Sequence, residues 1–394
     1  MELVLGMKDI YPKEARLRRH MTESLSRLFE QWGYEPVEPP TMEYAHVLEK
    51  IIGEEIKERL YQFVNREGKV VCLRPEFTTS VARMLSRGNP TLFPLRVYYA
   101  GRIFRYPSSP FHTESELTQI GVENIGSPSV QGDGEVIALA ISSLKRVGVE
   151  EFRVDIGHVG IFRHLLTSLP LQEEAKQTVK RLVKQRDFVA LQNFWEATNL
   201  THHPVTHIFL RFPFLRGKRE VLEEAETLFP HPEWHRTLHY LSELWTKLSD
   251  FGYEEYLTIN LGLIRDFDYY SGVIWEGFSP HLGYPLLAGG RYDELFQILG
   301  KDLPACGFAL FLERLVQVLK QPQGNIPEKI HLFYPSKGRR EAFQLAEKLR
   351  EQGYTVVIEE KEQSDFTFST SKKTIRFFSV ETEKIEELLK ELRT

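Results

Sequence analysis

Carboxylate, amide and arginine side chains recur between tyrosines on segments that the sequence pattern marks as strands. Glu76 and Thr78 lie two residues apart, and Gln119 and Glu123 lie four apart. Strand residues at even spacing point to the same side, so we expect these side chains to share a cleft. Carboxylates suit a ligand that carries an ammonium or other N–H donors, whereas an arginine suits a carboxylate. Together these groups describe a site for an amino acid such as histidine. A solvated acidic face of a sheet is the alternative.

Other common catalytic and ligand-binding patterns are absent from the sequence. It contains no G-x-x-x-x-G-K-[ST], no G-x-G-x-x-G after a strand and no G-x-S-x-G. Two histidine groups, 202–207 and 231–239, have spacings that could hold a metal. Neither is accompanied by paired cysteines or H-E-x-x-H, so we interpret both as solvated or capping histidines. We therefore expect no metal site and no cofactor.

The composition indicates a globular protein. The chain has 394 residues, of which 42% are hydrophobic and 27% are charged, with a net charge of −5. It has no apolar run of about 18 residues, so no membrane span is expected. Its two cysteines, Cys72 and Cys306, are too few for a disulfide framework. A cytoplasmic location is therefore expected, and the balanced charge does not favour a nucleic-acid-binding protein.

Hydrophobic periodicity predicts alternating helices and strands joined by short turns. In the first 160 residues we expect helices at 14–32, 78–87 and 133–147, a hairpin of 59–64 with 69–73, and strands at 95–105, 114–123 and 151–156. Residues 159–250 show helical periodicity and no convincing strand. Further strands are expected at 257–262, 267–276 and 284–288, and a buried strand that leads into a helix is expected at 305–320.

A proline- and glycine-containing segment at 320–328 indicates a linker. Beyond it, 329–394 alternates strands with helices at 338–352 and 382–392, which predicts a small α/β module. Segregated helices and tight turns favour an α+β fold with a mainly antiparallel sheet.

Six ordered blocks carry a family resemblance. They are Gly6–Pro12, Trp32–Glu43, Tyr98–Glu123, Leu263–Tyr270, Gly289–Asp293 and Gly307–Leu315. In these blocks the chain resembles histidyl-tRNA synthetases, and more closely their non-catalytic paralogues, the regulatory subunits of ATP phosphoribosyltransferase. The resemblance implies a class II aminoacyl-tRNA synthetase-like domain at 1–320, with a helical insertion at about 160–250 and a separate module at 329–394.

The resemblance also implies a role for individual residues in binding histidine. Glu76, Thr78 and Gln119 would surround its α-amino group, and Glu123 and Tyr270 would contact its imidazole. Arg105 would be the arginine of class II motif 2, Arg265 would lie near the carboxylate, and Tyr269 and Tyr292 would form walls. Charge-assisted hydrogen bonds at both ends of a small zwitterion make such a site selective.

The loop that follows Arg105 departs from what ATP binding in a synthetase needs. Pro107 stands where the resemblance implies a glutamate, and Thr113 and Ser115 stand where it implies arginines. Glu114 and Glu116 add negative charge, which would repel a triphosphate, and we expect no cation to offset it. Because the 329–394 module carries 13 Lys+Arg and 12 Asp+Glu, it lacks the basic surplus expected of a tRNA-binding domain.

These features together favour a regulatory subunit without catalytic residues. The resemblance implies a homodimer, formed through the extended segment around Pro39, that binds L-histidine and a short-form catalytic subunit and binds no tRNA. Such a subunit activates phosphoribosyl transfer and mediates feedback inhibition by histidine. An active histidyl-tRNA synthetase and a stand-alone histidine-binding paralogue are the alternatives.

Overall fold

The chain forms two compact units, Met1–Pro322 and Gln323–Thr394, and each is described by itself. The computed structural model describes residues 2–88, 93–107, 114–229, 231–264, 269–319, 329–362, 365–369 and 374–377. The expected linker at 320–328 and the expected helix at 382–392 lie outside these residues. Within the described part of the chain, no helix is long and apolar enough to cross a lipid bilayer.

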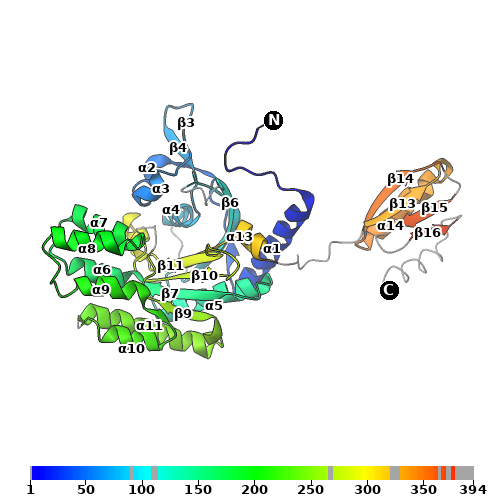
Figure 1. The fold of residues 1–394 in the computed structure, drawn as a ribbon. Coiled ribbons are helices and arrows are strands. Elements are labelled where there is room, and N and C mark those ends of the chain that lie inside the picture. Colours follow the sequence, from blue (N-terminus) through cyan, green and yellow to red (C-terminus); the bar gives the residue numbers. More distant parts are fainter. Residues whose placement is uncertain are drawn as a thin grey trace. The chain divides into compact units, whose positions relative to one another are not determined.

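A nine-stranded sheet runs through the first unit (Figure 1). In spatial order its strands are β1 (Glu35–Pro36), β5 (Leu95–Phe104), β6 (Glu116–Ile125), β12 (Ala305–Phe311), β11 (Leu287–Arg291), β10 (Val273–Phe278), β7 (Arg153–His158), β9 (Leu257–Asn260) and β8 (Arg216–Gly217). Neighbours pair in parallel at β1–β5 and at β7–β9, and antiparallel elsewhere. The sheet is therefore mixed, with the expected antiparallel pairing from β5 through β7.

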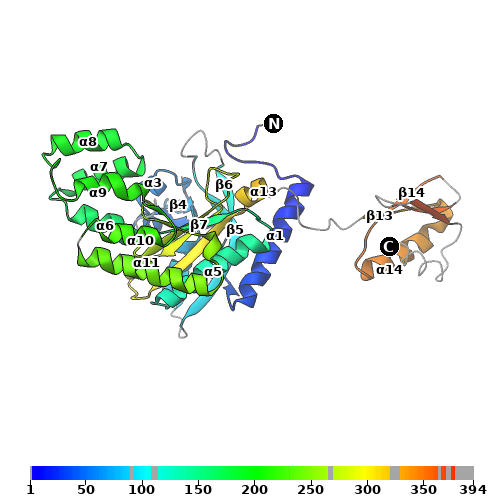
Figure 2. The ribbon, with the colours of Figure 1, turned by 60° about the horizontal axis from the view of Figure 1, so that its bottom comes forward.

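Long helices cover one face of this sheet (Figure 2). They are α1 (Pro12–Gln31), α5 (Val130–Arg146) and α11 (Pro232–Asp250). In α1 the buried side chains include Met21, Leu25 and Phe29, which recur four residues apart and so form one stripe. The more apolar α5 packs against α1, α11 and β12, which explains why its residues are buried on several sides. The helices expected at 14–32 and 133–147 are confirmed.

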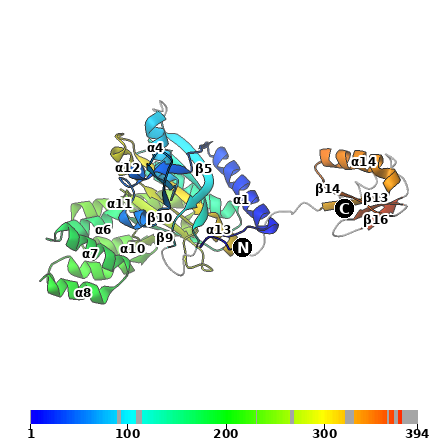
Figure 3. The same ribbon diagram turned by 90° about the horizontal axis from the view of Figure 1, so that it is seen from above.

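Smaller elements cover the opposite face of the sheet. There α4 (Thr78–Gly88) and α12 (Asp293–Ile298) lie side by side (Figure 3). A three-stranded sheet of β2 (Met42–Tyr44), β4 (Val70–Leu73) and β3 (Gln62–Val64) adjoins them, with the short helices α2 (Ala45–Leu48) and α3 (Glu54–Lys57). The expected hairpin is confirmed, because β3 and β4 pair antiparallel.

The chain between β7 and β9 is largely helical, as its periodicity predicted. Its elements are α6 (Val159–Thr167), α7 (Glu173–Lys184), α8 (Phe188–Ala197), α9 (Thr206–Arg211), η1 (Phe212–Phe214), β8, α10 (Glu220–Glu226), α11 and η2 (Glu254–Tyr256). The expectation of no strand here is wrong at β8, which pairs with β9. Two residues are too few to show the alternation that marks a strand.

The second unit contains a four-stranded sheet in the order β14 (Thr355–Glu360), β13 (Lys329–Tyr334), β15 (Phe366–Ser369) and β16 (Thr374–Phe377). The pairing is parallel between β13 and β14 and antiparallel for the other two pairs. The connection between β13 and β14 runs through η3 (Ser336–Gly338) and α14 (Arg339–Glu351). Leu345 and Leu349 of α14 are buried in this unit's core, which accounts for the helical period of the segment.

Candidate functional site

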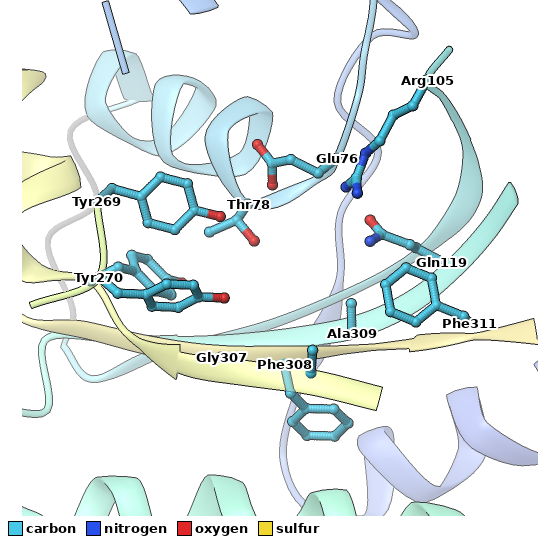
Figure 4. A pocket seen from close by; sticks show the side chains of 12 residues that line it. Glu76, Thr78, Arg105, Gln119, Tyr269, Tyr270, Gly307, Phe308, Ala309 and Phe311 are labelled. Atoms are coloured by element: carbon cyan, nitrogen blue, oxygen red, sulfur yellow. The ribbon is translucent and has the colours of Figure 1, made fainter. Parts of the chain in front are cut away.

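A pocket lies against the face of the nine-stranded sheet that α4 and α12 cover (Figure 4). Seven of the nine predicted site residues line it, namely Glu76, Thr78, Arg105, Gln119, Tyr269, Tyr270 and Tyr292. Glu123 adjoins the pocket through its hydrogen bond with Tyr292. Arg265 and the neighbouring 266–268 lie outside the described residues. The structure thus brings together residues that are scattered over more than half of the chain.

The floor of the pocket is made by cross-strand pairs of β6 and β12. The register pairs are Gly307 with Glu123, Ala309 with Gly121 and Phe311 with Gln119. Small residues at the centre of this floor leave space above the sheet. At Gly307 a side chain is excluded, since a Cβ there would lie 1.8 Å from Glu123 Oε2. The alternate residue Phe308 points away from the pocket (Figure 4).

Glu76 reaches the pocket from a turn. The premise that Glu76 and Thr78 share a strand is wrong, because β4 ends at Leu73 and α4 begins at Thr78. Glu76 Oε1 accepts a hydrogen bond of 2.9 Å from the backbone N–H of Thr79 in the first turn of α4. A carboxylate at a helix N-terminus is stabilised by the free amides there. This bond holds the side chain so that its other oxygen is available to the pocket.

Two buried acceptors in the pocket wall have no hydrogen-bond partner among the residues that the structure describes. They are Oε2 of Glu76 and Oε1 of Gln119, whose residues are 3% and 4% exposed. Buried polar atoms in folded proteins nearly always have partners, because an unpaired one costs free energy. Two such acceptors facing one pocket indicate a ligand that donates N–H hydrogen bonds.

Glu123 is the most deeply buried carboxyl group of the site, at 1% exposure. It accepts hydrogen bonds from the hydroxyls of Tyr292 and Tyr99. Burial raises the pKa of Glu123 to about 8, against the opposing effect of these hydrogen bonds. Burial likewise raises the pKa of Glu76. A ligand cation or N–H donor that approaches either group would favour its charged form.

Three tyrosines enclose the side of the pocket nearest Glu123. The rings of Tyr269 and Tyr270 lie 5.0 Å apart, and those of Tyr269 and Tyr292 lie 6.0 Å apart in an edge-on arrangement. All three are at least nine-tenths buried. The result is an aromatic slot with a carboxyl group at its base, which suits a flat ring that carries N–H groups.

Arg105 lies at the other side of the pocket, near Gln119 and Phe311 (Figure 4). Its Nε donates a hydrogen bond of 2.6 Å to the carbonyl oxygen of Pro75. This bond ties the guanidinium to the turn that carries Glu76. A fixed guanidinium beside the two unpaired acceptors can bind the carboxylate of an amino acid whose ammonium they accept.

The described part of the loop after Arg105 is held by contacts within the chain. Ser115 is 1% exposed, and its hydroxyl donates a hydrogen bond of 3.0 Å to the carbonyl oxygen of Leu5. The expectation that no cation offsets the loop carboxylates is wrong for Glu116, which forms an ion pair with Arg102. Both are strand residues, so their closeness depends on the β5–β6 register. Thr113, with 108–112, lies outside the described residues.

Several residues at the site were missed from the sequence. Ala288, Ala309 and Phe311 line the pocket, and Tyr99 donates to Glu123. A signal was present in the alternation Gly307, Ala309 against Phe308, Leu310, since small residues on one face of a strand mark a close approach or a hollow. No comparable signal marked Tyr99, whose partner lies on the adjacent strand.

The fold and pocket define a protein of the histidyl-tRNA synthetase class. The family model for histidyl-tRNA synthetase matches residues 6–315. A histidyl-tRNA synthetase structure from a Nostoc species superposes with a TM-score of 0.79 over 99% of each chain at 18% identity. That identity supports the likeness in fold alone.

Closer relatives place the chain within this class. A protein from Moorella thermoacetica named as an ATP phosphoribosyltransferase regulatory subunit is 37% identical over 92% of this chain and 93% of its own. One of the same name from Caldanaerobacter subterraneus is 33% identical over 89% and 92%. A Bacillus halodurans structure described as an ATP phosphoribosyltransferase regulatory subunit/histidyl-tRNA synthetase is 30% identical, with a TM-score of 0.81 over 91% and 92%. The chain belongs to the family of ATP phosphoribosyltransferase regulatory subunits.

Proposed function

We propose that this chain binds free L-histidine in the pocket and thereby regulates a short-form catalytic subunit of ATP phosphoribosyltransferase. That enzyme joins phosphoribosyl pyrophosphate to ATP in the first step of histidine biosynthesis. The observation that carries the proposal is a pair of buried acceptors in the pocket wall, Glu76 Oε2 and Gln119 Oε1, to which no described residue donates a hydrogen bond. Family membership supplies the partner.

Histidine matches the arrangement of charges around the pocket. Its ammonium can donate to Glu76 and Gln119, and its carboxylate can accept from Arg105. Its imidazole then extends into the tyrosine slot, where Glu123 can accept a ring N–H. Each of these contacts is a charge-assisted hydrogen bond or satisfies a buried acceptor, so amino acids without ring N–H groups should bind more weakly.

The same site is poorly equipped for aminoacyl transfer. A synthetase must stabilise the charge of ATP with cations in the loop after Arg105. In this chain Pro107 and Ser115 occupy loop positions for which the family resemblance implies charged residues, and Ser115 is committed to a hydrogen bond with Leu5. We therefore assign the chain a non-catalytic role within the glycosyltransferase complex.

A homodimer fits the exposed apolar surface of the three-stranded sheet. Phe63, Val64 and Val70 of its hairpin are 44%, 66% and 46% exposed, and Met42 of β2 is 56% exposed. Exposed apolar residues that gather on one small sheet are typical of interaction surfaces, and twofold dimers are the commonest oligomers. Light scattering of the purified chain should report twice its mass of 46.0 kDa. A single-chain mass at all concentrations would contradict the dimer.

The decisive experiment mixes this chain with a short-form catalytic subunit and measures phosphoribosyl transfer to ATP with increasing histidine. The chain should raise the rate, and histidine should lower it. The double variant Glu76→Gln, Glu123→Gln should still activate but should respond less to histidine, because allosteric inhibition requires unequal histidine binding to two states of the complex. Full inhibition of the double variant would place the sensing site elsewhere. Histidine-dependent pyrophosphate–ATP exchange by this chain alone, at about one turnover per second, would favour a synthetase.

A further inference from the structure

The side chains that form the floor of the pocket change abruptly in size along β12. Successive residues that face the pocket are Gly307, Ala309 and Phe311. Two small residues are followed by an aromatic ring in the last position of the strand. The ring is 7% exposed and lies directly opposite Gln119 in the β6–β12 register. The hollow above the sheet therefore ends at Phe311.

Contacts from two segments, 285–286 and the helix that follows the strand, hold Phe311 in place. Its backbone N–H donates a hydrogen bond of 3.0 Å to the carbonyl oxygen of Leu286. The guanidinium carbon of Arg314, on α13 (Leu312–Val318), lies 4.1 Å from the centre of its ring. Arg314 Nη1 in turn donates a hydrogen bond of 2.6 Å to the carbonyl oxygen of Pro285. A stacked and tethered ring resists displacement by a ligand.

The position of this ring matters because of the direction in which histidine would lie. Phe311, Gln119 and Arg105 stand at one side of the pocket, and Tyr269 and Tyr270 stand at the other (Figure 4). An imidazole among the tyrosines and an ammonium at Glu76 direct the carboxylate toward Arg105 and Phe311. A group attached to that carboxylate would then meet the Phe311 ring.

We propose that Phe311 is the end wall of the pocket and makes it selective for amino acids whose carboxyl end carries no additional group. Esters, substituted amides and peptides that begin with histidine carry extra atoms at this position and are rejected by their length. This inference rests on the proposed function, since it assumes that the pocket binds histidine. For a sensor, the wall restricts the signal to the free amino acid.

The test uses calorimetry on the full-length chain with three ligands. Histidinamide has the size of histidine without its carboxylate charge, and histidylglycine is longer but keeps a carboxylate. Wild-type protein should bind histidylglycine more weakly than histidinamide. Phe311→Ala should reduce this preference by about tenfold or more, the range over which hydrophobic pockets discriminate by size, and should leave the preference for histidine over histidinamide unchanged.

Two further variants control for loss of packing. Phe311→Leu, a milder change, should shift the same ratio in the same direction. Leu310→Val removes volume from the opposite face of β12, where Leu310 is fully buried, and should leave the ratio unchanged. The end wall is overturned if wild type binds histidylglycine as tightly as histidinamide, or if both folded Phe311 variants retain the wild-type ratio. If wild type binds no histidine, the proposed function fails.

Discussion

The buried carboxyl groups of the first unit fall into two sets that differ in their partners. Asp133 and Asp155, at 0% and 1% exposure, form ion pairs of 2.7 and 2.8 Å with Arg291 and Arg216. Glu76 and Glu123 are buried to a similar degree, yet within the described residues neither forms an ion pair. The effect of burial, which raises the pKa of both groups, is opposed in part by hydrogen bonds and, for Glu76, by the charge of Arg105.

This difference separates carboxylates that pair within the fold from those to which the proposed function assigns a ligand. Burying a charge without an ion-pair partner costs free energy. Removing the partner from a buried ion pair therefore destabilises the fold, because the remaining charge is left uncompensated. The paired aspartates tie strands and helices together, as Asp133 of α5 does when it binds Arg291 of β11. The pocket glutamates instead keep acceptor capacity for a ligand, at some cost in stability. Buried charged groups that lower stability in this way are typical of functional sites.

The largest effect is expected where a paired carboxylate loses its cation. Arg291→Met leaves Asp133 buried without its ion pair, so the free energy of unfolding should fall by about 3–5 kcal/mol. Urea denaturation of the purified variant measures this change. A loss below about 1 kcal/mol would contradict the view that this pair maintains the fold.

An exposed ion pair provides the matched control for this prediction. Arg163 pairs with Glu294 at 2.9 Å, and both side chains are more than two-fifths exposed. Arg163→Met should therefore change the free energy of unfolding by no more than about 1 kcal/mol. Equal losses for the two arginine variants would show that burial does not govern their contributions.

A pocket glutamate should behave in the opposite way. Glu123→Gln removes the charged acceptor of the imidazole, and the loss of a charge-assisted bond of about 1.5–3 kcal/mol should weaken histidine binding roughly 10- to 150-fold. Stability without histidine should be maintained at neutral pH, because the neutral amide replaces a carboxyl group whose pKa burial raises to about 8. Calorimetry measures the expected loss of affinity, and denaturation measures the expected unchanged stability. As a control, Glu116→Gln, outside the pocket, should leave histidine affinity unchanged, and unchanged affinity in Glu123→Gln would mean that the pocket is misassigned.

The smallest effect, counted per pH unit, is a dependence of stability on pH. The pKa of Glu123 is raised from 4.5 to about 8 in the folded protein, so between these values the folded state retains a proton that the unfolded state releases. The contribution of Glu123 to the free energy of unfolding should fall as pH rises through this window, by at most about 1.4 kcal/mol per pH unit. Subtracting the denaturation profile of Glu123→Gln from that of wild type isolates this slope. A difference that rises with pH would contradict the raised pKa.

Local patterns were sufficient to predict most secondary structure and much of the site. The stripe of Leu25 and its neighbours predicted α1, and the turn at 65–68 predicted the β3–β4 hairpin. The resemblance identified Glu76, Gln119 and Tyr270, which the structure places around one pocket. Histidine binding at these residues stays a prediction. The two-residue strand β8 was missed because it forms through pairing with β9 and has no local period of its own.

The sequence by itself determined which side chains alternate along each strand and where helices begin and end, since these depend on neighbours within a few residues. Only the tertiary structure decided that Gly307 lies opposite Glu123 and that Arg102 offsets Glu116. It also showed that a turn presents Glu76 and that Phe311 closes the floor of the pocket. These features depend on register between strands and on packing between distant segments, which composition and periodicity do not encode.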